Sequence, residues 1–252
     1  MFNTTIATQI YAKICFEATN SQKKIIENLS EYLSDDDFSR IFVLNGFAGT
    51  GKTTLIAALV AALKELRIKP VLLAPTGRAA KVLARYCGEQ ALTIHKRIYR
   101  QRTNADYESK FSLDFNREQG AVFIVDEASM LSDSTGDGAL FGSGSLLEDL
   151  VSYVRSGRSC RLILVGDSAQ LPPVGCDFSP ALDPATVSRY GEVVYGLMDE
   201  VVRQQMQSGI LFNATLVRCM LENRIYEIPK FEMDYPDFES VEGGDFMEKL
   251  QD

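Results

Sequence analysis

Eight consecutive residues from Gly46 to Thr53 combine glycines, a lysine and a threonine in a spacing suited to phosphate binding. They read G-F-A-G-T-G-K-T and fit the pattern G-x-x-x-x-G-K-[ST]. Glycines let backbone N–H groups approach phosphate oxygens, and a helix that begins near Lys52 adds partial positive charge. Lys52 supplies a charge to the β- and γ-phosphates, and the Thr53 hydroxyl is placed to bind Mg²⁺. The predicted nucleotide-binding residues are Gly46, Ala48, Gly49, Thr50, Gly51, Lys52, Thr53 and Thr54.

Two adjacent carboxylates, Asp126 and Glu127, follow an apolar run in the segment V-F-I-V-D-E-A-S. Side chains that follow the strands of an open α/β sheet reach the ligand crevice. We therefore expect Asp126 to hold Mg²⁺ and Glu127 to orient or deprotonate an attacking water. The pair favours hydrolysis over transfer of a phosphate to a small acceptor.

Four short apolar runs are expected to be the strands that position these groups. A near-continuous apolar run is typical of a strand buried on both faces of a parallel sheet. The runs are Ile41 to Leu44, Val71 to Ala74, Val122 to Val125 and Leu162 to Val165. Helices are expected at about residues 21–33, 52–67, 78–87, 146–155, 195–207 and 210–221. This alternation predicts an α/β fold with a mainly parallel sheet flanked by helices. The polar stretches 99–120 and 132–145 are expected to be loops or excursions from the sheet.

The composition is that of a compact globular protein. Of the 252 residues, 46% are hydrophobic and 24% are charged, which excludes disorder and a coiled-coil rod. No apolar run approaches the roughly 18 to 20 residues needed to span a bilayer, and no secretory leader is recognisable. The cysteines are far apart and lack a C-x-x-C pair, so we expect reduced thiols in a cytoplasmic protein that binds no membrane. They are Cys15, Cys87, Cys160, Cys176 and Cys219.

Charge is distributed unevenly along the chain. The formal net charge is -8, but residues 225–252 hold nine acidic and two basic side chains. Residues 78–102 hold seven basic side chains and one acidic side chain. Such a basic segment is suited to a phosphate backbone, and a solvated surface that balances the acidic tail is the alternative.

The phosphate-binding motif and four further motifs, taken in order, resemble superfamily 1 DNA helicases. The further motifs are A-P-T-G-R-A-A-K-V-L (74–83), T-I-H-K (93–96), V-D-E-A-S-M (125–130) and G-D-S-A-Q-L-P-P-V-G (166–175). The chain looks most like the RecD and Dda branch, over roughly residues 15–224. The resemblance implies the first RecA-like lobe of a P-loop NTPase that uses ATP and Mg²⁺ to move 5′ to 3′ on single-stranded DNA.

The resemblance also assigns roles to individual residues. It implies that Gln22 reads adenine, that Gln170 senses the γ-phosphate, and that Arg203 reaches the same phosphate. The expected catalytic residues are therefore Lys52, Asp126, Glu127, Gln170 and Arg203. The implied DNA-binding residues are Pro75, Thr76, Arg78, Lys81, Thr93 and His95. Three of the assigned residues have simpler alternatives. Gln22 could be a surface residue that opens a helix, His95 a packed histidine, and Arg203 an arginine paired with Asp199 or Glu200.

The sequence departs from the family pattern after Arg203. Only 49 residues remain, too few for the second RecA-like lobe that supplies another arginine in such helicases. We expect residues 1–224 to form the ATPase lobe and residues 225–252 an acidic connector toward an absent second lobe. The chain alone should then bind Mg·ATP without unwinding DNA. Two other functions stay open, a P-loop switch or adaptor that binds a protein partner through the acidic tail, and a small-molecule kinase; the oligomeric state is not predicted.

Overall fold

The computed structural model describes residues 2–14, 17–103, 109–133, 141–200, 202 and 208–237. The chain divides into two compact units, Met1–Glu200 and Val201–Asp252. The boundary expected after residue 224 therefore lies inside the second unit, and the connector role of residues 225–252 stays a prediction.

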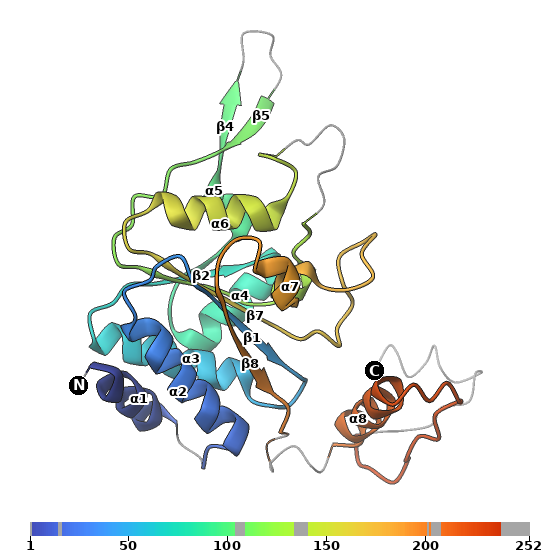
Figure 1. Cartoon of the computed structure of the whole chain (residues 1–252). Coiled ribbons are helices and arrows are strands. Elements are labelled where there is room, and N and C mark those ends of the chain that lie inside the picture. Colours follow the sequence, from blue (N-terminus) through green and yellow to red (C-terminus); the bar gives the residue numbers. More distant parts are fainter. Residues whose placement is uncertain are drawn as a thin grey trace. The chain divides into compact units, whose positions relative to one another are not determined.

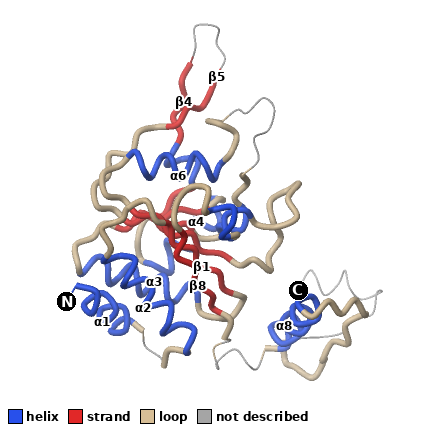
Figure 2. Tube along the Cα trace, viewed as in Figure 1, coloured by secondary structure: helices blue, strands red, loops and turns tan. Residues whose placement is uncertain are grey.

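A six-stranded parallel sheet forms the centre of the first unit (Figures 1 and 2). Its strand order is β3-β2-β6-β7-β1-β8. The strands are β1 (Ile41–Gly46), β2 (Pro70–Ala74), β3 (Ala91–Thr93), β6 (Val122–Val125), β7 (Arg161–Gly166) and β8 (Val193–Met198). The four predicted strands are the four central ones, whose side chains are covered on both faces and are therefore continuously apolar. The two strands that the sequence did not reveal, β3 and β8, lie at the edges.

The helix expected at residues 195–207 is wrong where the structure describes it. Residues 195–198 belong to β8, residues 199, 200 and 202 are in neither helix nor strand, and residues 201 and 203–207 lie outside the described part. Strand β8 is rich in β-branched and aromatic side chains, as in Val193, Val194 and Tyr195, and these fit a pleated, half-buried surface. Gly196 then lets a helix approach closely, because a Cβ atom at this position would lie 2.2 Å from Cδ1 of Ile25.

Helices cover both faces of the sheet and divide the interior into two cores. The first face carries α1 (Phe2–Lys13), α2 (Asn20–Ser34), α3 (Lys52–Glu65) and α4 (Gly77–Cys87). The second face carries α5 (Ile94–Ile98), α6 (Leu146–Ser156) and α7 (Pro184–Val187). In β1, Phe42 and Leu44 pack in the first core and Ile41 and Val43 in the second, as the alternation of side chains along a strand requires.

The polar stretch 99–120 contains an antiparallel hairpin outside the main sheet, so of the two expected forms it is an excursion from the sheet. Its strands are β4 (Tyr99–Thr103) and β5 (Ser109–Leu113), with Tyr99 opposite Leu113. Figure 1 shows this hairpin extending away from the sheet. Of the other expected loop, the described residues 132–133 and 141–145 are in neither helix nor strand, and residues 134–140 lie outside the described part.

The second unit contains α8 (Gly209–Glu222), close to the predicted helix 210–221. The side chain of Asn213 donates to the carbonyl of Glu232 at 2.7 Å and accepts from its N–H at 2.8 Å. Asp237 accepts hydrogen bonds from the Ser208 hydroxyl and the Gly209 N–H. The described part of the acidic segment is therefore bonded to α8 at two places. Among all described residues, no helix has the length and apolar character to span a bilayer.

Candidate functional site

The turn between β1 and α3 has the strand–turn–helix geometry that the glycine motif predicts. Gly49 and Gly51 have φ angles of +77° and +86°, a region that favours glycine. Gly46 is needed for a different reason, since a Cβ there would lie 3.0 Å from both the Lys52 side chain and Cβ of Met198. The turn thus brings its backbone close to the lysine at the start of α3.

Lys52 lies over this turn. Its Nζ donates to the carbonyl oxygens of Gly46 and Phe47, the latter at 2.9 Å. It also lies 3.8 Å from Oδ2 of Asp167, whose side chain is only 4% exposed. Burial lowers the pKa of Lys52, whereas the charges of nearby Asp167, Asp126 and Glu127 act in the opposite direction. One ammonium group is therefore surrounded by carboxylates at the carboxyl ends of β6 and β7.

Asp126 and Glu127 directly follow β6, as predicted. Burial raises the pKa of Asp126, opposed by the Glu127 N–H and by Lys52. Burial and the charges of Asp126 and Asp167 raise the pKa of half-buried Glu127, and Lys52 opposes them. A raised carboxyl pKa makes Glu127 a better proton acceptor at neutral pH.

Two site residues were not singled out from the sequence, Asp167 and Asn45. Asp167 follows β7 as Asp126 follows β6, and the strands are neighbours with Val125 opposite Leu164. The same reasoning about polar residues after buried strands would have found it. The buried Asn45 side chain donates to the Ser168 hydroxyl at 2.8 Å and accepts from the Ser168 N–H at 3.0 Å. Asn45 therefore fixes the turn that carries Asp167.

Gln170 is exposed on that turn, and its N–H donates to the Asp167 carbonyl at 3.1 Å. Its side-chain oxygen lies 3.5 Å from the hydroxyl of Ser129, which follows the carboxylate pair. The structure thus places Gln170 beside the segment after β6. Its role as a γ-phosphate sensor stays a prediction, and Arg203 lies outside the described residues.

Gln22 is not the surface residue of the simpler alternative, because it is 1% exposed. Its side-chain oxygen accepts from the Thr19 N–H at 3.0 Å, and the Thr19 hydroxyl accepts from the Gln22 N–H at 3.2 Å. This reciprocal pair is a capping box at the start of α2. The Nε2 of Gln22 donates to the carbonyl of Thr50 at 2.9 Å. Gln22 therefore joins α2 to the glycine turn, and contact with adenine stays a prediction.

Three of the predicted DNA-binding residues lie at the carboxyl ends of strands, as the nucleotide-binding residues do. Pro75 and Thr76 directly follow β2, and Thr93 ends β3. The hydroxyls of Thr76 and Thr93 accept from helix N–H groups, each at 3.2 Å, and so cap α4 and α5. Their caps orient two helices whose first turns carry basic residues.

The packed alternative fits the position of His95. Its ring is half-buried, 5.1 Å from the ring centroid of Phe141 and 5.6 Å from that of Tyr99. Burial lowers the pKa of His95, so the neutral imidazole is favoured. DNA contact by this residue stays a prediction.

The basic segment 78–102 divides into paired and unpaired cations. Arg97 forms an ion pair with Glu118 at 2.6 Å, and Arg100 one with Asp114 at 2.8 Å. Four other basic side chains are exposed and have no acidic group within ion-pair distance in the part of the chain that the structure describes. They are Arg78, Lys81, Arg85 and Lys96.

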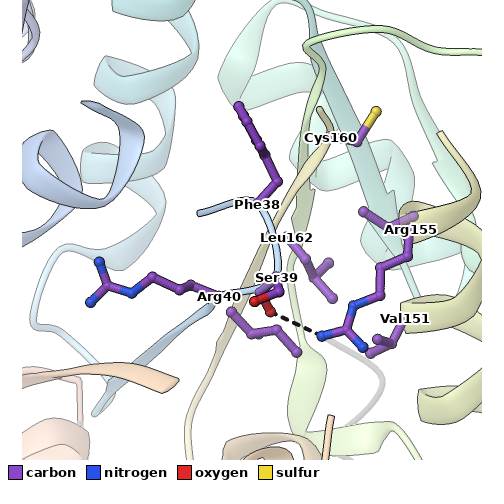
Figure 3. A pocket seen from close by; sticks show the side chains of 9 residues that line it. Phe38, Ser39, Arg40, Val151, Arg155, Cys160 and Leu162 are labelled. Atoms are coloured by element: carbon purple, nitrogen blue, oxygen red, sulfur yellow. Dashed lines mark hydrogen bonds between the residues drawn. The ribbon is translucent and has the colours of Figure 1, made fainter. Parts of the chain in front are cut away.

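An open cleft of about 340 Å³ joins the carboxylate pair to α4. Its lining residues are Thr76, Arg78, Ala79, Val82, Asp126, Glu127 and Met130. A different pocket lies at the amino end of β1, where Arg155 donates to the Ser39 carbonyl at 2.9 Å (Figure 3). That pocket has a volume of only about 10 Å³, too small for a nucleotide. The cleft is the candidate site because Asp126 and Glu127 line it.

The residues fit a magnesium ion that is shared with a nucleotide. Among the described residues, no three His, Cys, Asp or Glu side chains cluster as a metal site. Mg²⁺ needs no such cluster, because proteins usually hold it with one or two carboxylates and substrate phosphates. Thr53 and Asp126 supply oxygen donors of the kind that Mg²⁺ prefers.

Comparison with known proteins assigns the family. Residues 17–214 match the model of the AAA domain family. The chain belongs to this family. The AAA domain is 30% identical over 154 residues to the ATP-dependent RecD2 DNA helicase of Deinococcus radiodurans, a match over 61% of this chain and 19% of the helicase. It is 34% identical over 136 residues to the ATP-dependent DNA helicase Dda of Enterobacteria phage T4, over 52% of this chain and 28% of the helicase.

A solved structure supports the fold of this AAA domain. The Pif1 helicase from Bacteroides, in complex with ADP-AlF3 and single-stranded DNA, matches with a TM-score of 0.53 and 18% identity. The match covers 84% of this chain and 48% of that chain, so the AAA domain spans less than half of these relatives. Together the comparisons confirm the RecA-like P-loop NTPase fold and the resemblance to superfamily 1 helicases of the RecD and Dda branch.

Proposed function

We propose that the chain is the ATP-binding motor lobe of a DNA helicase that couples Mg·ATP hydrolysis to 5′ to 3′ movement on single-stranded DNA. One observation carries the proposal. The cleft of about 340 Å³ is lined both by the carboxylates Asp126 and Glu127 and by Thr76 and Arg78 of the predicted DNA path. The relatives named as ATP-dependent DNA helicases support the same function.

Each side chain of the nucleotide site has a separate task in hydrolysis. Lys52 pairs with the β- and γ-phosphates, and Thr53 and Asp126 hold Mg²⁺, which neutralises charge that develops on the phosphates. Glu127 orients a water and accepts its proton as the oxygen attacks the γ-phosphorus. The bond from that phosphorus to the β–γ bridging oxygen breaks, and ADP leaves with the electron pair. The acceptor role agrees with the direction in which burial and neighbouring charges move the pKa of Glu127.

A second RecA-like lobe is part of the proposal. An arginine that reaches the γ-phosphate contributes about 10³ to 10⁵ in rate. The resemblance assigns that role to Arg203 in this chain and to another arginine in the second lobe. We therefore expect the 252-residue chain to bind Mg·ATP well, to hydrolyse it slowly and not to separate strands. The proposed place of action is the cytoplasm, where the four described cysteines, all free, would stay reduced.

The DNA claim is tested by measuring the affinity for a fluorescent single-stranded oligonucleotide across a series of salt concentrations. For single strands, a plot of the logarithm of the binding constant against the logarithm of the salt concentration has a slope of about -0.7 for each phosphate neutralised. The double variant Arg78→Glu, Lys81→Glu is expected to bind more weakly and with a shallower slope. The charge-matched control is Lys23→Glu, Lys24→Glu on α2, where both lysines are exposed. Equal weakening by both double variants, or affinity that does not depend on salt, would contradict the proposed DNA path.

A further inference from the structure

Another cavity, of about 560 Å³, lies near the amino ends of the sheet strands, opposite the candidate site at their carboxyl ends. One of its walls is Glu118, whose two carboxylate oxygens accept from Lys69 at 2.8 Å. Lys69 directly precedes β2, and Pro70 pairs with Val122 at the amino ends of β2 and β6. Thr76 and Asp126 follow the carboxyl ends of the same strands. A five-residue β-strand spans about 16 Å, so this cavity and the cleft at Arg78 are separate sites at opposite ends of the same strands.

The cavity carries excess positive charge. Three arginines line it, Arg97, Arg100 and Arg117, against the two acids Asp114 and Glu118. Both acids are already paired, and Lys69 also shares Glu118. The exposed Arg117 has no acidic partner among the described residues, and the buried Nε of Arg97 has no acceptor there. The unused and exposed guanidinium donors of Arg117 favour an anionic ligand.

An aromatic ring stands beside these cations. The side chain of Phe115 is 63% exposed and lines the cavity together with Asp114 and Arg117. A flat aromatic surface beside arginines is the combination that binds single-stranded nucleic acid, through stacking of a base and pairing of its phosphates. A small inorganic anion would use the charge but would leave the ring and most of the volume without a purpose.

The cavity wall is fixed to the base of the β4–β5 hairpin. Arg100 belongs to β4, and Asp114 directly follows β5. The preceding residue, Tyr99, is buried and donates from its hydroxyl to Oδ2 of Asp149 on α6 at 2.6 Å. The chain is therefore anchored directly before Arg100, and Asp114 holds the Arg100 side chain at 2.8 Å, which lowers the entropic cost of binding.

We propose that this cavity binds the backbone and one base of a second nucleic-acid strand, distinct from the strand on Arg78 and Lys81. The inference rests on the proposed function, since an opening duplex delivers two strands to the protein. Phe115 stacks on a base, and the exposed Arg117 pairs with phosphates. The β4–β5 hairpin, whose base lines the cavity, then lies next to the second nucleic-acid strand.

The test compares two DNA probes, a forked duplex and a single-stranded oligonucleotide, by fluorescence anisotropy with the full chain. The variant is Phe115→Ala with Arg117→Gln, two exposed residues whose replacement leaves both cores intact. It is expected to lower the affinity for the fork by about fivefold or more, as the loss of one base stack predicts, and to leave the affinity for the single strand unchanged. The control Lys24→Gln removes one positive charge on α2 and should leave both affinities unchanged.

Two outcomes would overturn the inference. Unchanged affinity of the variant for the fork would show that the cavity is only a set of mutually satisfied ion pairs. Equal loss on both probes would place the cavity on the single-strand path. The proposed function is tested separately, because it requires Arg78→Glu, Lys81→Glu to weaken binding of the single strand whatever the fork shows.

Discussion

At the scale of single residues, the site is organised around one buried cation. Lys52 is held by the carbonyls of Gly46 and Phe47 and lies 3.8 Å from Asp167. The three nearby carboxylates favour its charged form, whereas burial disfavours it. A triphosphate would bring additional negative charge to this group, so nucleotide affinity should depend on Lys52 more than on any other side chain of the turn.

Replacement of Lys52 by alanine is therefore expected to raise the Kd for ATP by about 100-fold or more, since two charge-assisted hydrogen bonds are lost. The fold should persist, because no buried acid relies on this lysine alone. Isothermal titration calorimetry with Mg·ATP measures the effect, and Lys24→Ala on α2 is the control. An unchanged Kd would refute the assignment of the phosphate site.

The pKa of Asp126 gives a prediction about pH. Burial raises the pKa of this carboxyl above its unfolded value, so the folded state holds the proton more tightly. The resulting stabilisation is complete below the unfolded pKa, about 3.9, and is lost as the pH rises through the folded pKa. Asp126→Asn should thus raise the midpoint of thermal unfolding at pH 7 without nucleotide, by an amount that shrinks as the pH is lowered toward 4. A variant less stable than the parent at pH 7 would show that attraction to Lys52 outweighs burial.

At the scale of elements, one junction joins a helix start to the nucleotide turn. Gln22 closes the cap of α2 with Thr19 and also donates to the Thr50 carbonyl. Gln22→Ala should lose both interactions and cost about 1–3 kcal/mol of unfolding free energy. Thr19→Val removes only the cap and should cost about 1 kcal/mol.

Nucleotide affinity separates the two roles of this junction. The Gln22 variant should bind Mg·ATP more weakly because the turn around Thr50 is less restrained, while the Thr19 variant should bind it as the parent does. Urea unfolding and calorimetry provide the two measurements. Equal nucleotide affinity in both variants would confine Gln22 to the helix cap.

Close packing of α2 on β8 gives a second prediction at this scale. A methyl group at Gly196 would meet Cδ1 of Ile25 at 2.2 Å, so Gly196→Ala should destabilise the chain by about 1–3 kcal/mol. Ile25→Val removes that carbon and alone costs about 0.5–1.5 kcal/mol. In the Gly196→Ala background the second change should cost less or become favourable. A double-mutant cycle in urea measures the coupling, and purely additive effects would contradict the packing argument.

The same elements show what the sequence can and cannot predict. Strands β1, β2, β6 and β7 were predictable because burial on both faces makes them continuously apolar, and Asp126 and Glu127 were predictable because they follow one of these strands. Residues 195–198 of edge strand β8 were predicted as part of a helix, since the half-exposed pattern of this strand carries a weaker signal. The bond from Gln22 to Thr50 joins residues 28 positions apart and depends on how α2 packs, which no local pattern encodes.

At the scale of the whole molecule, the parallel sheet separates two kinds of chemistry. Its carboxyl edge carries the glycine turn, the carboxylates and the exposed cations of α4. Its amino edge carries the arginine-lined cavity at the base of the β4–β5 hairpin. A motor lobe of this design would sense ATP and one strand at one edge and meet a second strand at the other.

The most direct test of the central claim is a crystal structure of the chain with Mg²⁺ and a nonhydrolysable ATP analogue. We predict that the β- and γ-phosphates accept hydrogen bonds from the backbone N–H groups of Gly49, Gly51 and Lys52, and that Mg²⁺ lies between Thr53 and Asp126. Lys52 Nζ should leave the Gly46 carbonyl and bind the phosphates. A nucleotide bound elsewhere, with Lys52 still on that carbonyl, would contradict the account.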